Sequence, residues 1–144
     1  MSTAKKIIET DISKAPEPPL GNSPILGNRY TSREFMELEW EHMWTKVWLI
    51  AGLVEELPNK GDYITCEMGR ESILCVRDNK HKIRAFYNVC QHRANRLVQS
   101  EKGTAETFSC GYHGWQYALD GELIYVRDEE DFPQGNPCGR LRLT

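Results

Sequence analysis

The amino-acid sequence predicts a mainly β protein, an antiparallel β-sandwich with one leading α-helix. Three observations indicate this fold: short apolar runs rich in β-branched residues, turn residues that separate these runs, and one amphipathic stretch that precedes them. The chain has 144 residues, of which 40% are hydrophobic, so it is about one domain long and can bury a core.

The helix is predicted at about Ser32 to Lys46. Thr31 followed three residues later by Glu34 has the spacing of a capping box. Apolar residues then recur at three- and four-residue spacing: Met36, Trp40, Met43, Trp44 and Val47. This stripe predicts that the tryptophans at 40, 44 and 48 belong to the core. The proline-rich stretch Ala15 to Asn28 predicts an extended arm, so residues 1–46 form an arm and a helix.

Residues 47–144 form the predicted β domain, in which turn residues such as Asp78-Asn79 separate the strands. The predicted strands are Val47 to Leu53, Tyr63 to Met68, Ser72 to Arg77, Lys82 to Val89, Glu106 to Cys110, Gln116 to Leu119 and Glu122 to Val126. Asp120-Gly121 between the last two predicts a type I′ hairpin turn. The segment Arg140 to Leu143 resembles an incomplete strand, so we expect the chain to be truncated.

Composition argues against nucleic acid and membrane surfaces as partners. The 18 Lys and Arg residues nearly balance the 21 Asp and Glu residues, the net charge is −3, and no block of like charge occurs. Lys5 and Lys6 are followed by only two apolar residues, too few for a signal peptide. The longest apolar run, Val47 to Val54, is too short to span a bilayer. We therefore expect a cytoplasmic protein.

The cysteine count favours metal ligation. Five cysteines is an odd number, and without a secretory signal a disulfide framework is the less favoured use. Cys66 and Cys75 fall inside predicted strands, where a free cysteine is mostly a small buried hydrophobe. Cys138 has no assignable role.

The most informative motif has two arms, Cys90-Gln91-His92 and Cys110-Gly111-Tyr112-His113, with seventeen residues between His92 and Cys110. Each arm supplies one thiolate and one imidazole. This is the donor set of a Rieske two-iron, two-sulfur (2Fe–2S) cluster, in which two cysteines hold one iron and two histidines hold the other. Cys90 and Cys110 would therefore hold one iron, and His92 and His113 the other.

Five further residues beside these ligands are predicted to surround the cluster. They are Arg93, Gly111, Tyr112, Gly114 and Trp115. The two glycines lack side chains, so backbone N–H groups can approach the sulfurs and donate hydrogen bonds. Trp115 would cover one side of the cluster against water.

A structural zinc site is the alternative for the same four residues, since thiolates select zinc as well as iron–sulfur clusters. Zinc sites, however, usually pair cysteine with cysteine across two to four residues, and a Cys-x-His arm is unusual among them. The two remaining histidines are weaker candidates: His42 lies in the predicted helix and His81 in a turn.

With these motifs, the chain resembles the N-terminal Rieske domain of the large (α) subunit of ring-hydroxylating, non-haem iron oxygenases. The resemblance rests on Glu39, Trp40 and Trp44, on 61–63, on Asn88 to Arg93, on Cys110 to Trp115 and on Leu119 to Gly121. Two departures occur: the family usually has Gly where Ala94 stands and Pro where Gly111 stands. Both residues shape the backbone, so these departures affect hydrogen bonding to the cluster and leave the ligands unchanged.

Two other Rieske classes fit less well. Respiratory and photosynthetic Rieske proteins add one cysteine to each loop, and here Tyr112 occupies the position in the second loop. Free-standing Rieske ferredoxins share the disulfide-free loops but normally lack the arm and the Trp-rich helix.

The resemblance implies a function. The cluster would take electrons from a reductase or ferredoxin and pass them to a mononuclear Fe(II) site held by a 2-His-1-carboxylate triad. His42 and His81 show no triad spacing, so we expect this oxygen-activating domain to be absent. Neighbouring α subunits, forming a homotrimer at full length, are the implied partners. The alternatives are a Rieske ferredoxin and a zinc-stabilised binding module, and the sequence does not identify a substrate.

Overall fold

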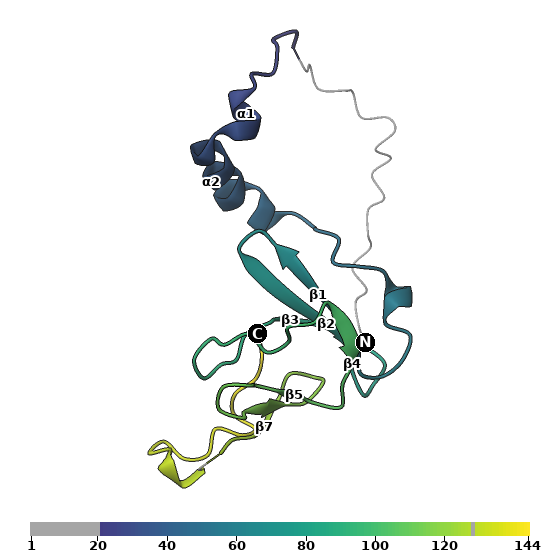
Figure 1. Ribbon diagram of the computed structural model, residues 1–144, viewed down its shortest axis with the longest axis vertical. Helices are drawn as coiled ribbons and strands as arrows, with labels where there is room; N and C mark the ends of the chain where they lie inside the picture. Colours follow the sequence, from purple (N-terminus) through teal and green to yellow (C-terminus); the bar gives the residue numbers. More distant parts are fainter. Residues whose placement is uncertain (1–20, 128) are drawn as a thin grey trace, which may run out of the picture.

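The computed structural model describes residues 21–127 and 129–144. The predicted arm begins at Ala15, so its first part lies outside the described residues, and residues 21–27 belong to no helix or strand. Figure 1 shows an elongated arrangement, with two helices at one end, a four-stranded sheet in the middle and a three-stranded sheet at the other end. Antiparallel sheets with a leading helix confirm the predicted fold class.

The larger sheet is antiparallel, with the strand order β3-β2-β1-β4. Its strands are β1 (Asp62–Met68), β2 (Glu71–Arg77), β3 (Ile83–Tyr87) and β4 (Lys102–Thr104). Strands β1, β2 and β3 confirm three predictions. Both faces of β2 are covered, because Leu74 and Val76 join the main core while Cys75 packs with Leu57 and Ile64 on the opposite face.

The smaller sheet has the order β5-β6-β7. Its strands are β5 (Phe108–Ser109), β6 (Gln116–Tyr117) and β7 (Leu123–Tyr125), each shorter than predicted. The β6–β7 hairpin forms, but its turn is not type I′. The N–H of Gly121 donates to the carbonyl of Ala118 at 2.9 Å, and within this described turn only Gly121 has a positive φ, +89°. A three-residue hairpin loop has this pattern, whereas type I′ needs positive φ at both central residues.

The predicted helix is present but shorter, and its cap differs from the prediction. Ser32, not Thr31, is the N-cap: its hydroxyl accepts from the N–H of Phe35 at 3.2 Å and donates to Glu34 at 2.8 Å. At Met43, φ of −125° and ψ of −66° end the helix. The helical elements are α1 (Asn28–Thr31), α2 (Arg33–His42), η2 (Trp44–Lys46), η3 (Val54–Glu56) and η4 (Glu129–Asp131).

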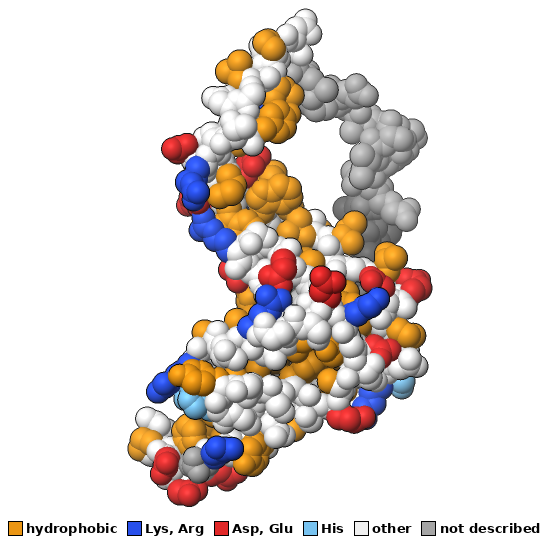
Figure 2. Space-filling view, viewed as in Figure 1, with side chains coloured by type: hydrophobic (Ala, Val, Ile, Leu, Met, Phe, Trp, Pro, Cys, Tyr) orange, Lys and Arg blue, Asp and Glu red, His pale blue; other side chains and the backbone are white. Residues whose placement is uncertain are grey.

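The prediction that the tryptophan stripe belongs to the core is wrong. Trp48 is fully exposed and Trp44 is 40% exposed. Trp40 is half-buried, and its ring lies over Gly69 in the β1–β2 turn, where a Cβ would collide with it. The helix therefore packs on the tip of a hairpin, and Figure 2 shows apolar side chains on the surface at this end of the molecule.

The predicted strand Val47 to Leu53 is also wrong, since these residues form neither helix nor strand and Ile50 is 88% exposed. The edge of β1 is occupied instead by β4, which was not predicted. Thr104 of β4 pairs with Asp62 of β1 and donates its hydroxyl to that carboxylate at 2.6 Å. The sequence of β4, Lys-Gly-Thr, lacks the apolar alternation by which strands are recognised.

The main core joins the two sheets and includes both motif cysteines. Its members are Leu74, Val76, Phe86, Cys90, Leu97, Val98, Phe108, Cys110, Trp115, Tyr117, Leu119, Leu123, Val126 and Leu143. The fully buried side chain of Asn88 accepts from the N–H of Val98 at 2.9 Å and donates to its carbonyl at 2.8 Å. Asn88 thus ties the end of β3 to residue 98. No helix in the described part of the chain is long and apolar enough to cross a membrane.

Candidate metal centre

The first Cys–His arm lies in a closed loop, Cys90 to Asn95, which we call loop one. Its backbone is closed by two hydrogen bonds, from the N–H of Cys90 to the carbonyl of Asn95 at 2.8 Å and from the N–H of Ala94 to the carbonyl of Cys90 at 2.9 Å. Ala94 lies in the left-handed region with φ of +52°. A bridge between Val89 and Arg96 holds the two ends of the loop together.

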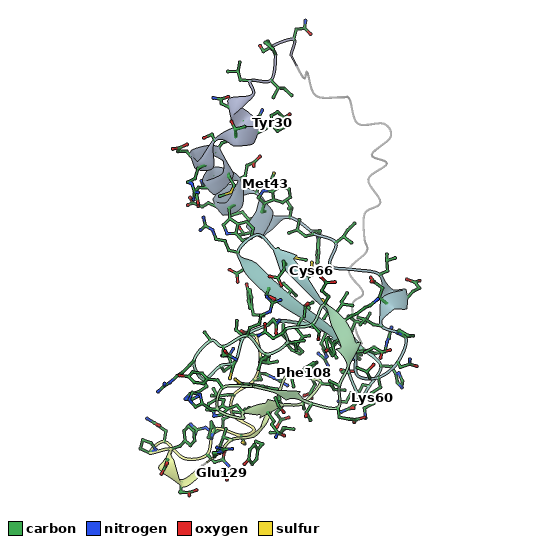
Figure 3. All side chains as sticks on the ribbon, in the orientation of Figure 1. Tyr30, Met43, Lys60, Cys66, Phe108 and Glu129 are labelled. Carbon is green, nitrogen blue, oxygen red and sulfur yellow. The ribbon has the colours of Figure 1, made fainter. Side chains whose placement is uncertain are left out.

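The second arm lies in loop two, Cys110 to Trp115, which connects β5 to β6. The N–H of Cys110 donates to the carbonyl of Trp115 at 2.8 Å, and the N–H of Gly114 donates to the carbonyl of Cys110 at 3.0 Å. Gly114 has a φ of +73°. Loop two therefore repeats the closure of loop one, position by position. Figure 3 labels Phe108, which precedes loop two and is buried.

The loops bring the four predicted ligands together. The rings of His92 and His113 meet edge to face, with 4.6 Å between their centroids. Cys90 and Cys110 are both buried, and their side chains lie within hydrogen-bonding reach of each other. The Nδ1 atoms of both histidines are buried without a hydrogen-bond partner in the described part of the chain. Such an atom is costly unless another group uses its lone pair.

Burial, together with the nearby His113 and Arg93, lowers the pKa of His92 below its usual value. His92 is therefore a neutral imidazole at neutral pH, the form that binds metals.

The thiol of Cys90 is contacted by the hydroxyl of Tyr117, a residue that was not predicted to belong to the site. The Oη atom lies 3.3 Å from the Cys90 Sγ and accepts from the N–H of Gln91 at 3.0 Å. Burial and the neighbouring sulfur raise the pKa of Tyr117, so the hydroxyl keeps its proton and can donate it to the sulfur. Burial also raises the pKa of the Cys90 thiol.

The thiol of Cys110 is surrounded by N–H donors. Burial raises its pKa, but the backbone N–H groups of Tyr112 and His113, together with Cys90 and the Asn95 side chain, outweigh burial and leave the pKa of Cys110 below its usual value. These donors would equally stabilise a thiolate bound to metal.

The two aromatic residues predicted beside the ligands contact the histidine rings. Trp115 is buried and stacks on His92, with 4.8 Å between ring centroids and an interplanar angle of 9°. Tyr112 lies 3.8 Å from His113 but is 59% exposed. Trp115 thus covers one face of an imidazole, while Tyr112 borders solvent.

The other three predicted neighbours have different roles. Arg93 is exposed, and its charge contributes to the lowered pKa of His92. Gly114 supplies the left-handed turn of loop two, and its N–H serves the loop closure. Gly111 has open space around its Cα. The backbone N–H groups that approach the Cys110 sulfur belong to the neighbouring residues Tyr112 and His113.

A depression of about 320 Å³ lies beside the two histidine rings. Its other lining residues are Tyr112, Trp115, Arg127, Asp131 and Phe132. The Phe132 ring lies 6.0 Å from the Trp115 ring. The imidazoles therefore border a surface that solvent reaches.

The histidines and cysteines outside the two loops lie apart from this site. His42 and His81 are exposed, and His81 has a φ of +57° in its turn. Cys75 is buried, as predicted, whereas Cys66 and Cys138 are half-buried free thiols.

Comparison with known protein families matches residues 47–135 to the Rieske [2Fe-2S] domain. The chain belongs to this Rieske family. Its cofactor is therefore a Rieske [2Fe–2S] cluster, and the resemblance found in the sequence is confirmed. The donor set and the two unpartnered Nδ1 atoms of His92 and His113 fit this group, which needs two thiolates and two imidazoles.

Curated relatives of this Rieske chain are oxygenase subunits. The glycine betaine monooxygenase oxygenase subunit of Pseudomonas aeruginosa is 39% identical over 100 residues, which are 69% of this chain and 23% of the relative. The biphenyl 2,3-dioxygenase α subunit of Rhodococcus jostii is 38% identical over 105 residues, 72% of this chain and 23% of the relative. The chain thus spans about a quarter of the length of these relatives.

Solved structures that are similar to this chain are also oxygenases. The apo form of the quaternary ammonium Rieske monooxygenase CntA aligns with a TM-score of 0.74 and 33% identity, over 81% of this chain and 34% of that one. Naphthalene 1,2-dioxygenase from Rhodococcus sp. aligns with a TM-score of 0.72 and 29% identity, over 77% and 26%. A further CntA structure gives insights into inter-subunit electron transfer in that enzyme.

Sequence reasoning missed three residues that shape the Rieske site: Asn88, Asn95 and Tyr117. The alternation of β6 could have identified Tyr117 as inward-facing, since it follows Gln116 in a predicted strand. Asn88 and Asn95 carry no such signal, because their hydrogen-bond partners are distant in sequence or belong to the other loop.

Proposed function

We propose that Cys90, His92, Cys110 and His113 hold the Rieske cluster, and that the chain relays single electrons within a mono- or dioxygenase. The electrons would come from a reductase or ferredoxin and pass to a mononuclear Fe(II) site in another part of the longer protein. Identities of 38–39% to oxygenase subunits support this proposal. The single observation that carries the ligand assignment is the pair of buried, unpartnered Nδ1 atoms on His92 and His113.

A Rieske cluster supplies reversible one-electron transfer at a potential set by its ligands and hydrogen bonds. The residues of this chain tune and shield it. Tyr117 donates its hydroxyl proton toward Cys90, which stabilises negative charge on that sulfur. Trp115 excludes water from one face of His92. The rings of His92 and His113 border the surface depression, which gives a redox partner a short path to them.

Metal and sulfide analysis of the purified chain tests the ligand assignment. We expect two irons and two acid-labile sulfides per chain, and after reduction an electron paramagnetic resonance (EPR) spectrum with an average g value below that of all-cysteine clusters. Stoichiometric zinc without labile sulfide would establish the zinc-stabilised binding module instead.

Turnover assays test the oxygenase assignment. We expect the 144-residue chain, supplied with reductase and oxygen, to be reduced but to hydroxylate no member of a panel of aromatic and quaternary ammonium compounds. Oxygen activation needs a metal with open coordination positions, and the four proposed ligands leave none. Hydroxylated product from this chain alone would contradict the proposal.

The partners and the compartment are parts of the same proposal. Inter-subunit electron transfer in CntA supports neighbouring α subunits as the electron acceptors. The full-length assembly that we propose is a homotrimer. A free-standing ferredoxin would instead carry electrons between a reductase and a separate soluble acceptor, and faster reduction of such an acceptor in the presence of the chain would favour that function. Free thiols at Cys66, Cys75 and Cys138 support a cytoplasmic location, where thiols stay reduced.

A further inference from the structure

Asn95 connects the two loops. Its carbonyl accepts from the N–H of Cys90 at 2.8 Å, which fixes the backbone of Asn95 within loop one. Its side-chain Nδ2 lies 3.6 Å from the Sγ of Cys110 in loop two and donates to the carbonyl of Arg96 at 2.9 Å. One residue thus contacts the cysteines of both loops, through its backbone in one and through its side chain in the other.

The orientation of the Asn95 amide follows from its two neighbours. The carbonyl of Arg96 accepts hydrogen bonds only, and so does a Cys110 thiolate. Rotating the amide by half a turn would place the Oδ1 atom against both of these acceptors. The NH₂ group, which has two hydrogens, satisfies one acceptor with each.

A residue of loop two also contacts a proposed ligand on loop one. Trp115 occupies in loop two the position that Asn95 occupies in loop one, since each follows its cysteine by five residues and each accepts the N–H of that cysteine. The Trp115 ring stacks on His92 of loop one at 4.8 Å. Each loop therefore ends in a residue whose side chain contacts a proposed ligand on the other loop.

We propose that Asn95 is a positioning residue that donates its amide N–H to the Cys110 thiolate and thereby raises the reduction potential of the cluster. The reduced cluster carries one more negative charge than the oxidised cluster, so a donor to the sulfur stabilises the reduced state more. This inference rests on the proposed cluster and its ligands.

The test compares Asn95→Asp and Asn95→Leu with the unsubstituted 144-residue chain. Asp keeps the size of the side chain but replaces the donor with a carboxylate, and Leu removes all polarity. We expect both variants to shift the reduction equilibrium roughly tenfold toward the oxidised state, which is about 59 mV for a one-electron couple. Gln99→Leu is the matched control, because Gln99 is exposed and lies outside both loops. It should leave the potential unchanged.

A second measurement detects the hydrogen bond between Asn95 and Cys110 directly. With ¹⁵N in the asparagine side-chain amides, pulsed EPR of the reduced chain should show a weak ¹⁵N coupling that Asn95→Leu removes. Cluster-loaded variants with an unchanged potential, or the absence of this coupling in the unsubstituted chain, would overturn the role of Asn95. A chain without iron and labile sulfide would instead overturn the proposed cluster ligands, and the role of Asn95 with them.

Discussion

Loop one and loop two have the same backbone closure but differ at each side chain that follows the cysteine. The histidine is the second residue after Cys90 in loop one and the third after Cys110 in loop two. The left-handed position holds Ala94 in one loop and Gly114 in the other. The backbone closure and the left-handed turn are therefore the shared features of the two loops, while the spacing from cysteine to histidine can vary by one residue.

The largest effect is expected from the cysteines, whose positions in the two closures correspond. Cys90→Ser and Cys110→Ser should each abolish cluster binding, since either change removes a thiolate from the proposed pair on one iron. Loss of the visible absorption band and of labile sulfide would measure this. Cys138→Ser, a cysteine outside both loops, is the control and should retain the full cluster content. Retention of a cluster by either loop variant would contradict equal roles for the loops.

The next effect concerns the support of loop one. Asn88→Ala should lower the free energy of unfolding by about 2–3 kcal/mol, because it leaves the buried N–H of Val98 without a partner and removes one of the two donors to the Val98 carbonyl, the other being Arg96. Asn79→Ala, at an exposed turn, should change it by less than about 0.5 kcal/mol. Denaturant unfolding measures both. Equal effects would show that Asn88 does not support loop one.

The donors to the two sulfurs extend the comparison, since Tyr117 serves Cys90 as Asn95 serves Cys110. We expect the unsubstituted chain to have a midpoint potential at the low end of the Rieske range, about −150 mV. Tyr117→Phe should lower it by about 40 mV, since one hydrogen bond contributes about 1 kcal/mol and 59 mV corresponds to a tenfold change. Voltammetry measures this, and Tyr125→Phe, at an exposed position of β7, is the control. A rise in potential would contradict donation by Tyr117.

The smallest effect comes from exchanging the left-handed residues. Gly114→Ala should destabilise the chain by about 1 kcal/mol through backbone strain alone, because a Cβ there meets no other atom within 4 Å. Ala94→Gly should stabilise it by about 0.5 kcal/mol, since relief of the strain exceeds the entropy cost of glycine. Thermal unfolding measures the pair. Shifts of the same sign would show that the two turns are not equivalent.

The sequence predicted the parts of the fold whose pattern is local. β1, β2 and β3 are β-rich runs of five to seven residues bounded by turn residues, and both loops carry their ligands within four residues. The segment Val47 to Leu53 has the composition of a strand but no neighbouring strand, because β4 occupies the free edge of β1. Pairing partners are decided by the whole chain, which a short window does not contain.

Some residues of the site could likewise be predicted from a local pattern in the sequence, and others could not. Cys90, His92, Cys110 and His113 could be chosen from spacing alone, and the structure brings them together; their role as ligands stays a proposal. The donors at Asn95 and Tyr117 could not be chosen in this way, because each reaches a sulfur through a contact between separate segments. The closure of the two loops could not be predicted from the sequence either, because it depends on backbone hydrogen bonds and not on residue type.

The elongated arrangement in Figure 1 places the helical end of the molecule far from the end at which electrons would be exchanged. Helices α1 and α2 lie at one end, and the small sheet whose β5 and β6 carry loop two lies at the other, with the four-stranded sheet between them. A molecule bound along α1 and α2 would leave the histidine-side depression open. A stable contact at the helical end and a transient contact of a redox partner at the depression can therefore exist at the same time. Substitutions at the helical end can then change binding there without changing the rate of electron exchange at the depression.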